Sequence, residues 1–203
     1  MFLDLDMFLP DFFMNKVEDI NLEKLKQLGF DSIIPDLDNT LVGWRSRTMS
    51  DSVKKWIETA IESGFKLCIV SNCLLHGRVR FFGEMLGIPF VFRAIKPRKK
   101  SFMDALKILD SPPDRTVVIG DQVFTDVFGG NRMGFLTILV LPIDKKEFYA
   151  TLIQRTAEKI LLSGFRKKGV LKELCEESER PLIKTPKTNS SDEGKNRTLK
   201  KNQ

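Results

Sequence analysis

Hydrophobic positions follow two alternating patterns between residues 31 and 143. Five short runs are continuously apolar and rich in β-branched and aromatic residues, which is typical of strands covered on both faces. These runs span Ser32–Ile34, Lys66–Val70, Phe90–Phe92, Thr116–Ile119 and Leu136–Leu141. Stretches with apolar residues at helical spacing separate them. The alternation predicts an α/β fold with a doubly wound, mostly parallel sheet, whose ligand crevice lies at the carboxyl ends of the strands.

Four helices are predicted in the connections. The first begins after Ser50, which can cap its amino terminus, and ends at Gly64. The others cover about Gly77–Leu86, Lys99–Leu109 and Asp126–Met133, and each stops close to a glycine or a proline. Each pair of consecutive strands is therefore joined by a helical crossover.

Segments of different character flank this core. Residues 1–30 combine an aromatic stretch with a short helical pattern and are expected to form an arm that packs on the core. Residues 144–175 form a basic amphipathic helical pattern, whose apolar face includes Ile153, Ile160 and Phe165. Residues 176–203 lack aromatic side chains and are rich in Ser, Lys, Asn and Thr, so we expect a disordered tail.

Composition narrows the class of protein further. The 203 residues suffice for one domain with appendages, and 42% hydrophobic residues is ordinary for a folded globular chain. No apolar stretch is long enough to span a bilayer, and the three cysteines show no metal-ligand or disulfide pattern. These features predict a cytoplasmic protein, which would meet a membrane only at its periphery.

The net charge of +6 comes from the end of the chain. Met1–Asp144 contains 18 basic and 19 acidic residues, whereas Lys145–Gln203 contains 15 basic and 8 acidic residues. A basic end favours anionic surfaces such as membrane headgroups, RNA or an acidic partner, or it serves only as a solubilising tail. The apolar face of the amphipathic helix could equally pack on the core or form a dimer.

Polar residues with catalytic potential follow four of the predicted strands. Asp36, Asp38 and Thr40 come after the first run, Ser71 and Asn72 after the second, Lys96 after the third, and Asp121 and Asp126 after the fourth. The carboxyl ends of parallel strands share one edge of the sheet, so these loops should converge. Several carboxylates in one crevice repel one another, and a hard divalent cation such as Mg²⁺ would offset that repulsion.

The same residues suit phosphoryl transfer. A cation, the Lys96 ammonium group and the Ser71 hydroxyl together form a receptor for a phosphoryl group. Two carboxylates at the spacing Asp-x-Asp, such as Asp36 and Asp38, can take separate catalytic roles. One attacks phosphorus, and the other donates a proton to the leaving oxygen and then accepts one from water.

The motifs resemble those of a known family. Asp36-x-Asp38-x-Thr40, Ser71, Lys96 and Gly120-Asp121-x-x-x-x-Asp126 are similar to the four motifs of the haloacid dehalogenase (HAD) superfamily, in their usual order. Phe8-Leu9-Pro10-Asp11 and the run from Gly120 to Arg132 resemble, more narrowly, the YqeG family of bacterial phosphatases in subclass IIIA. The likeness covers about Phe8 to Phe165. It implies a HAD-like catalytic core over residues 31–143.

The resemblance also implies a role for each site residue. Asp36 would be the nucleophile and Asp38 the general acid and base. Asp36 and Asp121 would bind Mg²⁺ through their side chains, Asp38 through its backbone carbonyl, and Asp126 through water or from the second coordination sphere. The phosphoryl group would be held by Thr40, Ser71, Asn72 and Lys96. One departure is Pro35, which stands where the family usually has a residue with an N–H group, so either the strand ends there or activity is altered.

The connections between the motifs leave room for little more than one helix each. The site should therefore be uncapped and should accept a phosphate carried by a large or lipid-presented substrate. The resulting hypothesis is a Mg²⁺-dependent phosphomonoester hydrolase, with phosphatidylglycerophosphate as a plausible substrate and an anionic membrane as a peripheral contact; nucleic acid is not the expected partner. The alternative is a catalytically weak HAD-like protein that binds a GTPase, RNA or membrane partner. The sequence leaves the oligomeric state open.

Overall fold

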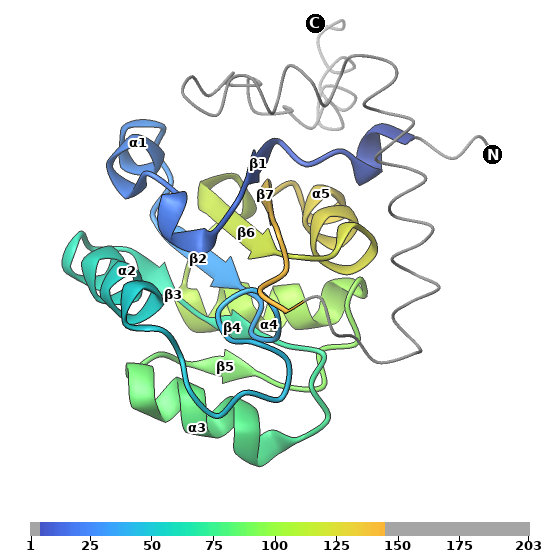
Figure 1. The fold of residues 1–203 in the computed structure, drawn as a ribbon. Helices are drawn as coiled ribbons and strands as arrows, with labels where there is room; N and C mark the ends of the chain where they lie inside the picture. The colour runs from blue at the N-terminus through green and yellow to red at the C-terminus, as the bar shows by residue number, and fades with distance from the viewer. Residues whose placement is uncertain (1–4, 145–203) are drawn as a thin grey trace, which may run out of the picture.

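A computed structural model describes residues 5–144 of the chain (Figure 1). The strands are β1 (Phe12–Met14), β2 (Ser32–Pro35), β3 (Lys66–Leu67), β4 (Ile69–Val70), β5 (Phe90–Val91), β6 (Thr116–Gly120) and β7 (Leu136–Val140). The α-helices are α1 (Leu22–Gln27), α2 (Asp51–Glu62), α3 (His76–Leu86), α4 (Lys99–Leu109) and α5 (Phe128–Met133). The shorter turns are η1 (Leu5–Phe8), η2 (Val17–Asp19), η3 (Pro113–Arg115) and the π-helical η4 (Val123–Val127). The basic helix and the tail predicted beyond residue 144 lie outside the described residues.

All described strand pairs are parallel, which confirms the predicted α/β class. The main sheet has the order β1-β7-β6-β2-β3, and β4 pairs with β5. The predicted strand Lys66–Val70 changes partner at Cys68. The Cys68 N–H donates to Ile33 at 3.1 Å, whereas the next N–H, that of Ile69, donates to Pro89 at 2.9 Å. One extended segment therefore joins the main sheet to β5.

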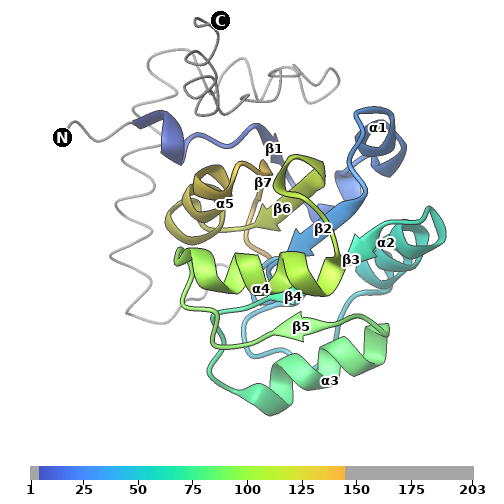
Figure 2. The ribbon, with the colours of Figure 1, turned by 180° about the vertical axis from the view of Figure 1, so that it is seen from behind.

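Helices cover both faces of the sheet. Buried side chains of α1, α2 and α3 share one hydrophobic cluster with Ile33, Val117 and Ile119. Those of α4 form a second cluster with Ile34, Val118 and Phe135, and the view from behind shows α4 and α5 on that side (Figure 2). Ile33 and Ile34 thus supply consecutive side chains to opposite cores, as expected of a strand buried on both faces.

The helix ends follow the sequence signals. The Ser50 side chain accepts a hydrogen bond from the Val53 N–H at 3.3 Å and caps α2. Gly87 and Gly134 have φ of 65° and 79° and end α3 and α5 in the left-handed conformation that glycine permits. The predicted helix from Asp126 differs at its start, because the chain first forms the π-helical turn η4 and becomes α-helical at Phe128.

The amino-terminal residues contribute a strand that the hydrophobic pattern does not predict. Phe12–Met14 form β1 and pair with Ile138–Val140 at the edge of the sheet. Asp11 fixes the entry to this strand, since its Oδ2 accepts hydrogen bonds from the Thr137 N–H at 2.9 Å and the Thr137 hydroxyl at 3.0 Å. The Asn131 amide donates to the main-chain oxygens of Met7 and Leu9, both at 2.9 Å. The segment is thereby tied to β7 and α5.

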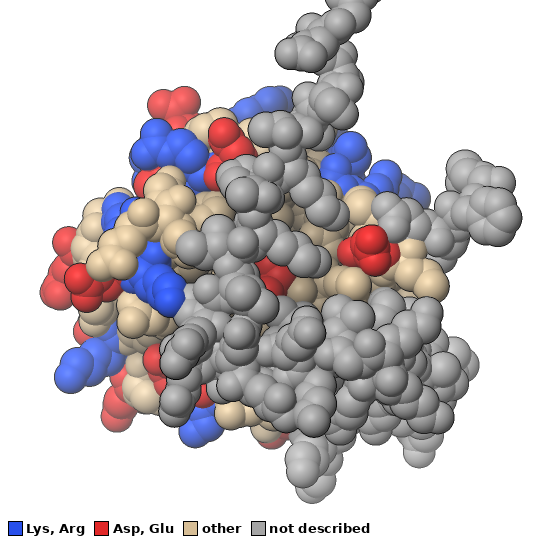
Figure 3. Space-filling view, turned by 90° about the horizontal axis from the view of Figure 1, so that it is seen from above, with Lys and Arg blue, Asp and Glu red and all other residues tan. Residues whose placement is uncertain are grey.

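No helix within residues 5–144 is both long enough and apolar enough to cross a membrane. On the face seen from above, the coloured Lys and Arg side chains are interspersed with Asp and Glu rather than gathered into one patch (Figure 3). The charge on that part of the described surface is therefore mixed.

Candidate active site

The first site loop begins where β2 ends. Pro35 is the last residue of β2, and the Asp36 N–H continues the ladder to β6 with a hydrogen bond to Ile119 at 2.8 Å. On the other side of β2, the pairing with β3 stops at Ile33, before the proline. Because Pro35 has no N–H to donate, it stands where a ladder to that neighbour is not continued. Asp36 therefore lies directly after the carboxyl end of β2, at the edge of the sheet.

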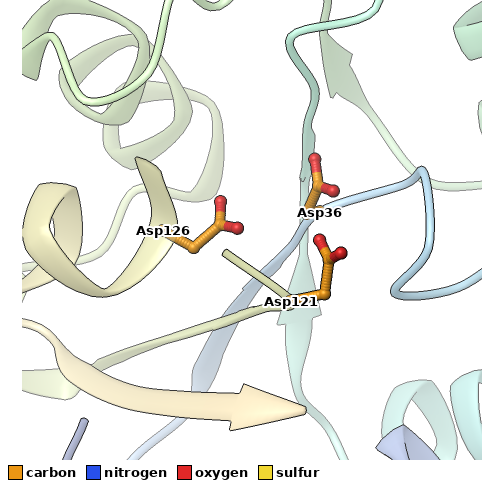
Figure 4. Close-up of side chains that lie close together, drawn as sticks. All are labelled: Asp36, Asp121 and Asp126. Carbon is orange, nitrogen blue, oxygen red and sulfur yellow. The ribbon is translucent and has the colours of Figure 1, made fainter. Parts of the chain in front are cut away.

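Three buried carboxylates meet at this edge. Asp36 follows β2, Asp121 follows β6, and Asp126 lies in η4 (Figure 4). One oxygen of each lies within 4.8 Å of the others, and all three residues are buried. The sequence predicts that these residues converge, although 85 positions separate Asp36 from Asp121. The parallel sheet brings them together by ending β2 and β6 side by side.

Lys96 supplies a positive charge inside the acidic cluster. Its Nζ lies 2.6 Å from Asp36 Oδ1 and 2.7 Å from Asp126 Oδ1, and its side chain is only 3% exposed. Burial alone would lower the pKa of Lys96, but the adjacent charges of Asp126 and Asp36 outweigh burial and raise it. We conclude that Lys96 stays protonated and bridges the two carboxylates.

The main chain of Lys96 is held by Asn72. The Lys96 N–H donates to the Asn72 side-chain oxygen at 2.7 Å, and the Asn72 amide donates back to the Lys96 carbonyl at 3.4 Å. The peptide bond between Lys96 and Pro97 is cis. The loop after β4 thus fixes the position of the loop after β5. The sequence predicts that Asn72 holds phosphate, but in the structure its side chain is directed at the Lys96 backbone.

Near pH 7, Asp36 is present in both its charged and its neutral form. Burial raises the pKa of Asp36 to about 7, the Lys96 ammonium group opposes this rise, and the charges of Asp126 and Asp38 add to it. One ammonium group does not compensate three clustered carboxylates. Excess negative charge on oxygen ligands is the condition that a hard divalent cation satisfies, so the residues present fit such an ion.

Asp126 is engaged through both of its oxygens. Oδ1 pairs with Lys96, and Oδ2 accepts a hydrogen bond from the Gln122 N–H at 3.2 Å. Its side chain also packs directly against Gly120, where a Cβ would lie only 2.2 Å from it. This arrangement suits a group that orients Lys96 and the loop after β6.

Asp38 is bound by an arginine that the sequence analysis did not single out. Arg78 of α3 donates to Asp38 Oδ1 from Nε at 3.0 Å and from Nη2 at 2.8 Å. The same guanidinium group donates to the main-chain oxygens of Gly43 and Ser46. No local signal marks Arg78, because its partners lie 32 to 40 positions earlier in the chain.

Thr40 and Ser71 are both buried at the site loops. Thr40 is 2% exposed, and its hydroxyl has no hydrogen-bond partner among the described residues. The Ser71 hydroxyl accepts a hydrogen bond from the Cys73 N–H at 3.1 Å, and its main chain pairs with Val91 and Ala94. Both hydroxyl groups therefore sit on well-anchored turns at the carboxyl edge of the sheet.

Comparison with known proteins identifies relatives. Residues 94–142 match a family described as HAD-hydrolase-like. "Probable phosphatase YqeG" of Bacillus subtilis (strain 168) is 43% identical over 162 residues, covering 80% of this chain and 94% of the relative. "Phosphatidylglycerophosphate phosphatase 1, chloroplastic/mitochondrial" of Arabidopsis thaliana is 26% identical over 177 residues, covering 82% of this chain and 51% of the relative. The chain thus spans about half the length of the Arabidopsis protein.

Solved structures show a more limited likeness. An uncharacterized protein from Listeria monocytogenes serotype 4b is 19% identical with a TM-score of 0.48, covering 60% of this chain and 87% of the other. A HAD phosphatase from Thermococcus onnurineus is 21% identical with a TM-score of 0.43, covering half of each chain. The family assignment rests instead on sequence identity and on the site motifs. With 43% identity over four fifths of its length, the chain belongs to the YqeG family and is a phosphatase of the HAD superfamily.

Proposed function

We propose that the protein is a Mg²⁺-dependent phosphomonoester hydrolase that works through an aspartyl-phosphate intermediate. The observation that carries this proposal is the placement of Asp36 within 2.6 Å of the buried Lys96 ammonium and within 4.8 Å of the carboxylates of Asp121 and Asp126. A carboxylate nucleophile beside a buried ammonium group, in a cluster of carboxylates that suits a divalent cation, fits attack on a phosphate monoester, whose non-bridging oxygens are anionic.

In the first step, a carboxylate oxygen of Asp36 bonds to phosphorus, and the bond from phosphorus to the ester oxygen breaks. Asp38 gives its proton to that leaving oxygen. In the second step, Asp38 takes a proton from water and the water oxygen bonds to the phosphorus of the aspartyl-phosphate. The bond from phosphorus to the Asp36 oxygen breaks, which restores the Asp36 carboxylate and releases inorganic phosphate. Lys96 and Ser71 would hold the phosphoryl oxygens during both steps, and Thr40 and Asn72 would brace the loops.

Asp36 and Asp121 would hold the metal ion with their side chains, Asp38 would do so with its main-chain oxygen, and Asp126 would act through water. When bound, Mg²⁺ would neutralise charge on the phosphoryl oxygens and keep Asp36 ionised. The raised pKa of the buried Asp36 supports this assignment, because the carboxylate lacks enough positive charge from the protein alone.

The substrate we propose carries its phosphate on a lipid, with phosphatidylglycerophosphate as the leading candidate. Two observations support this choice. The segment between Thr40 and Ser71 forms one long helix, α2, and the segment between Ser71 and Lys96 forms α3, so neither inserts a domain over the site. The Arabidopsis relative is named as a phosphatidylglycerophosphate phosphatase. An open site could bind the phosphate of a lipid headgroup when the protein approaches the membrane surface from the cytoplasm.

Phosphate release from p-nitrophenyl phosphate tests the chemistry. The wild-type protein should need added Mg²⁺ and lose activity in excess EDTA, and Asp36→Asn should abolish turnover. Asp114→Asn is the matched control, because Asp114 is an exposed aspartate in η3, away from the strand ends that carry the site. Full activity of Asp36→Asn would refute the nucleophile assignment, and full activity in EDTA would refute the metal requirement.

A substrate comparison tests the lipid proposal. Phosphatidylglycerophosphate in mixed micelles should be hydrolysed with a higher kcat/KM than sugar phosphates or a phosphopeptide at equal phosphate concentration. Preference for a soluble ester would overturn the substrate proposal and leave the hydrolase proposal standing.

A further inference from the structure

Three loops around the candidate site expose apolar side chains. Leu74 and Leu75, which follow β4, are 70% and 68% exposed, and Ile95, just before Lys96, is 56% exposed. Trp44, which follows the loop of Asp36 and Asp38, is 38% exposed. Single exposed apolar residues are ordinary on a surface, but four large ones on loops that begin at one edge of a sheet form an unusual group.

Hydrogen bonds hold these loops together. Arg78 donates to main-chain oxygens of Gly43 and Ser46, which flank Trp44 and Arg45. The Arg93 N–H donates to the Cys73 carbonyl at 3.3 Å, next to Leu74. The three loops are therefore linked to one another, and we call their exposed apolar and basic residues the site rim. It consists of Trp44, Arg45, Arg47, Leu74, Leu75, Arg93, Ile95 and Arg98.

The charged residues of the site rim are basic, with one acidic neighbour, Asp144, whose carboxylate lies beside Gly43. Residues 43–50, 71–77 and 92–100 contain no Asp or Glu, and their exposed charged residues are Arg45, Arg47, Arg93, Arg98, Lys99 and Lys100. This differs from the mixed charge on the face in Figure 3. Apolar side chains interspersed with arginines match the interface of an anionic bilayer, where the apolar groups enter the acyl boundary and the basic groups meet headgroups.

The backbone holds the exposed residues of the site rim in place. Arg45, Arg93 and Ile95 have φ of 56°, 49° and 53°, in the left-handed region that β-branched and long side chains disfavour. Ile95 is thus held in an unfavourable conformation with most of its side chain outside the protein. Hydrogen bonds on both sides hold this backbone in place, because the Arg98 N–H donates to the Ile95 carbonyl at 3.0 Å and the Ala94 N–H donates to Ser71 at 3.0 Å.

We propose that the site rim is the surface by which the protein docks on an anionic bilayer, with Leu74 and Leu75 as the inserting residues. The inference rests on the proposed lipid-phosphate activity for its choice of partner. Docking through the rim brings the mouth of the site to headgroup level, so that a phosphate can reach Asp36 without the lipid leaving the membrane. Nucleic acid or an acidic protein would match the arginines but not the leucines.

Vesicle flotation of the full-length protein tests the apolar contribution. Wild type and Leu74→Ser/Leu75→Ser are compared on vesicles of phosphatidylcholine with phosphatidylglycerol, at low salt. The double variant should bind at least about tenfold more weakly, since it removes two aliphatic side chains from the acyl boundary. Ile61→Ser/Ile108→Ser is the matched control, because these side chains are 42% and 48% exposed near the carboxyl ends of α2 and α4. It should bind as wild type does.

A second pair of variants tests the charge. Arg45→Gln/Arg47→Gln should weaken binding by about fivefold for each charge removed, and the difference should vanish at high salt. Lys55→Gln/Lys107→Gln, which removes two exposed charges from α2 and α4, should have little effect. Residues 145–203 are present in every variant, so any binding by them is common to all the comparisons.

Four outcomes would overturn the proposal. The first is a wild-type protein that does not float with anionic vesicles, and the second is equal binding by wild type and Leu74→Ser/Leu75→Ser. The third is an equal loss of binding in the Ile61→Ser/Ile108→Ser control, and the fourth is a rim variant that changes only self-association, as measured by sedimentation. Flotation needs no turnover. If Asp36→Asn floats normally but the wild type hydrolyses no phosphate ester, the proposed function fails and the docking surface stands.

Discussion

Arg78 and Asp38 are joined by two hydrogen bonds to one carboxylate oxygen, at 3.0 and 2.8 Å. The arginine lies in the first turn of α3 and the aspartate in the loop after β2, so the pair connects the segments that follow two different strands. Two further donors of Arg78 bind the carbonyls of Gly43 and Ser46. Arg78 therefore sets the position of the proposed general acid and base without itself lying in the acidic cluster.

Removal of Arg78 should impair proton transfer more than phosphorus attack. In Arg78→Ala, hydrolysis of an alkyl phosphate should fall about 10- to 100-fold, because the alkoxide leaving group needs the proton of a well-placed Asp38. Hydrolysis of p-nitrophenyl phosphate should fall much less, since its leaving group departs readily as an anion. Steady-state kinetics on both esters measure the difference.

Arg80→Ala serves as the control for that experiment. Arg80 lies in the same helix, is exposed, and pairs only with Glu84 at 2.7 Å among the contacts described. It should leave both activities unchanged. An equal loss on the two esters in Arg78→Ala would contradict a role through Asp38 and would indicate general distortion of the site.

Replacement of Lys96 should destabilise the protein as well as inactivate it. Lys96→Met leaves the buried Asp36 and Asp126 without their cation, and loss of one member of a buried ion pair costs about 3–5 kcal/mol. Urea unfolding in EDTA measures the loss. The double variant Lys96→Met/Asp126→Asn should regain part of the free energy of unfolding, because it removes one uncompensated charge. No recovery in the double variant would contradict the coupling of these two residues.

Gly120→Ala should disturb the site through packing alone. The added methyl group would lie 2.2 Å from the Asp126 side chain, so Asp126 must move away from Lys96. We expect a loss of about 1–3 kcal/mol in the free energy of unfolding, together with weaker phosphate release. Gly77→Ala is the matched control, since a Cβ there meets no atom within 4 Å and Gly77 lies in α3. It should be neutral or slightly stabilising, and a similar loss in both variants would contradict the packing argument.

The stability of the metal-free protein should fall as the pH rises toward 7. The pKa of Asp36 is about 7 when folded, compared with an ordinary value of 3.8, mainly because of burial. The folded state therefore holds a proton that the unfolded state has lost over this window, and each further pH unit lowers the free energy of unfolding by at most about 1.4 kcal/mol. Above the folded pKa this contribution levels off. Urea unfolding in EDTA at several pH values measures the effect.

Asp36→Asn is the control for the pH series, because its neutral side chain cannot lose a proton. Its stability should lack this component of the pH dependence. Parallel profiles for Asp36→Asn and the wild type would show that Asp36 titrates normally and that burial does not hold its proton.

Most of the sheet and all of the acidic cluster were predictable from sequence. The strands of the core are unbroken apolar runs, Asp36 and Asp121 stand directly after β2 and β6, and Lys96 lies in the loop after β5, so the parallel topology determines that they meet. Gly87 and Gly134 ended their helices as predicted, because a positive φ is a local property of glycine.

The features that were not predicted depend on distant partners. β1 has only three half-buried residues, and it becomes a strand by pairing with β7 at a separation of 126 positions. Arg78 looks in the sequence like any exposed helical arginine, and only the folded chain brings Asp38 to it. The partner exchange at Cys68 likewise has no local signal, since Lys66–Val70 reads as one apolar run.

The edge strand β1 also protects the sheet. Without it, the outer N–H and C=O groups of β7 would be free to pair with strands of other molecules. A truncation that begins beyond Met14 would remove this strand together with Asp11 and the carbonyls bound by Asn131. We therefore expect the truncated protein to aggregate, although its catalytic core would otherwise be complete.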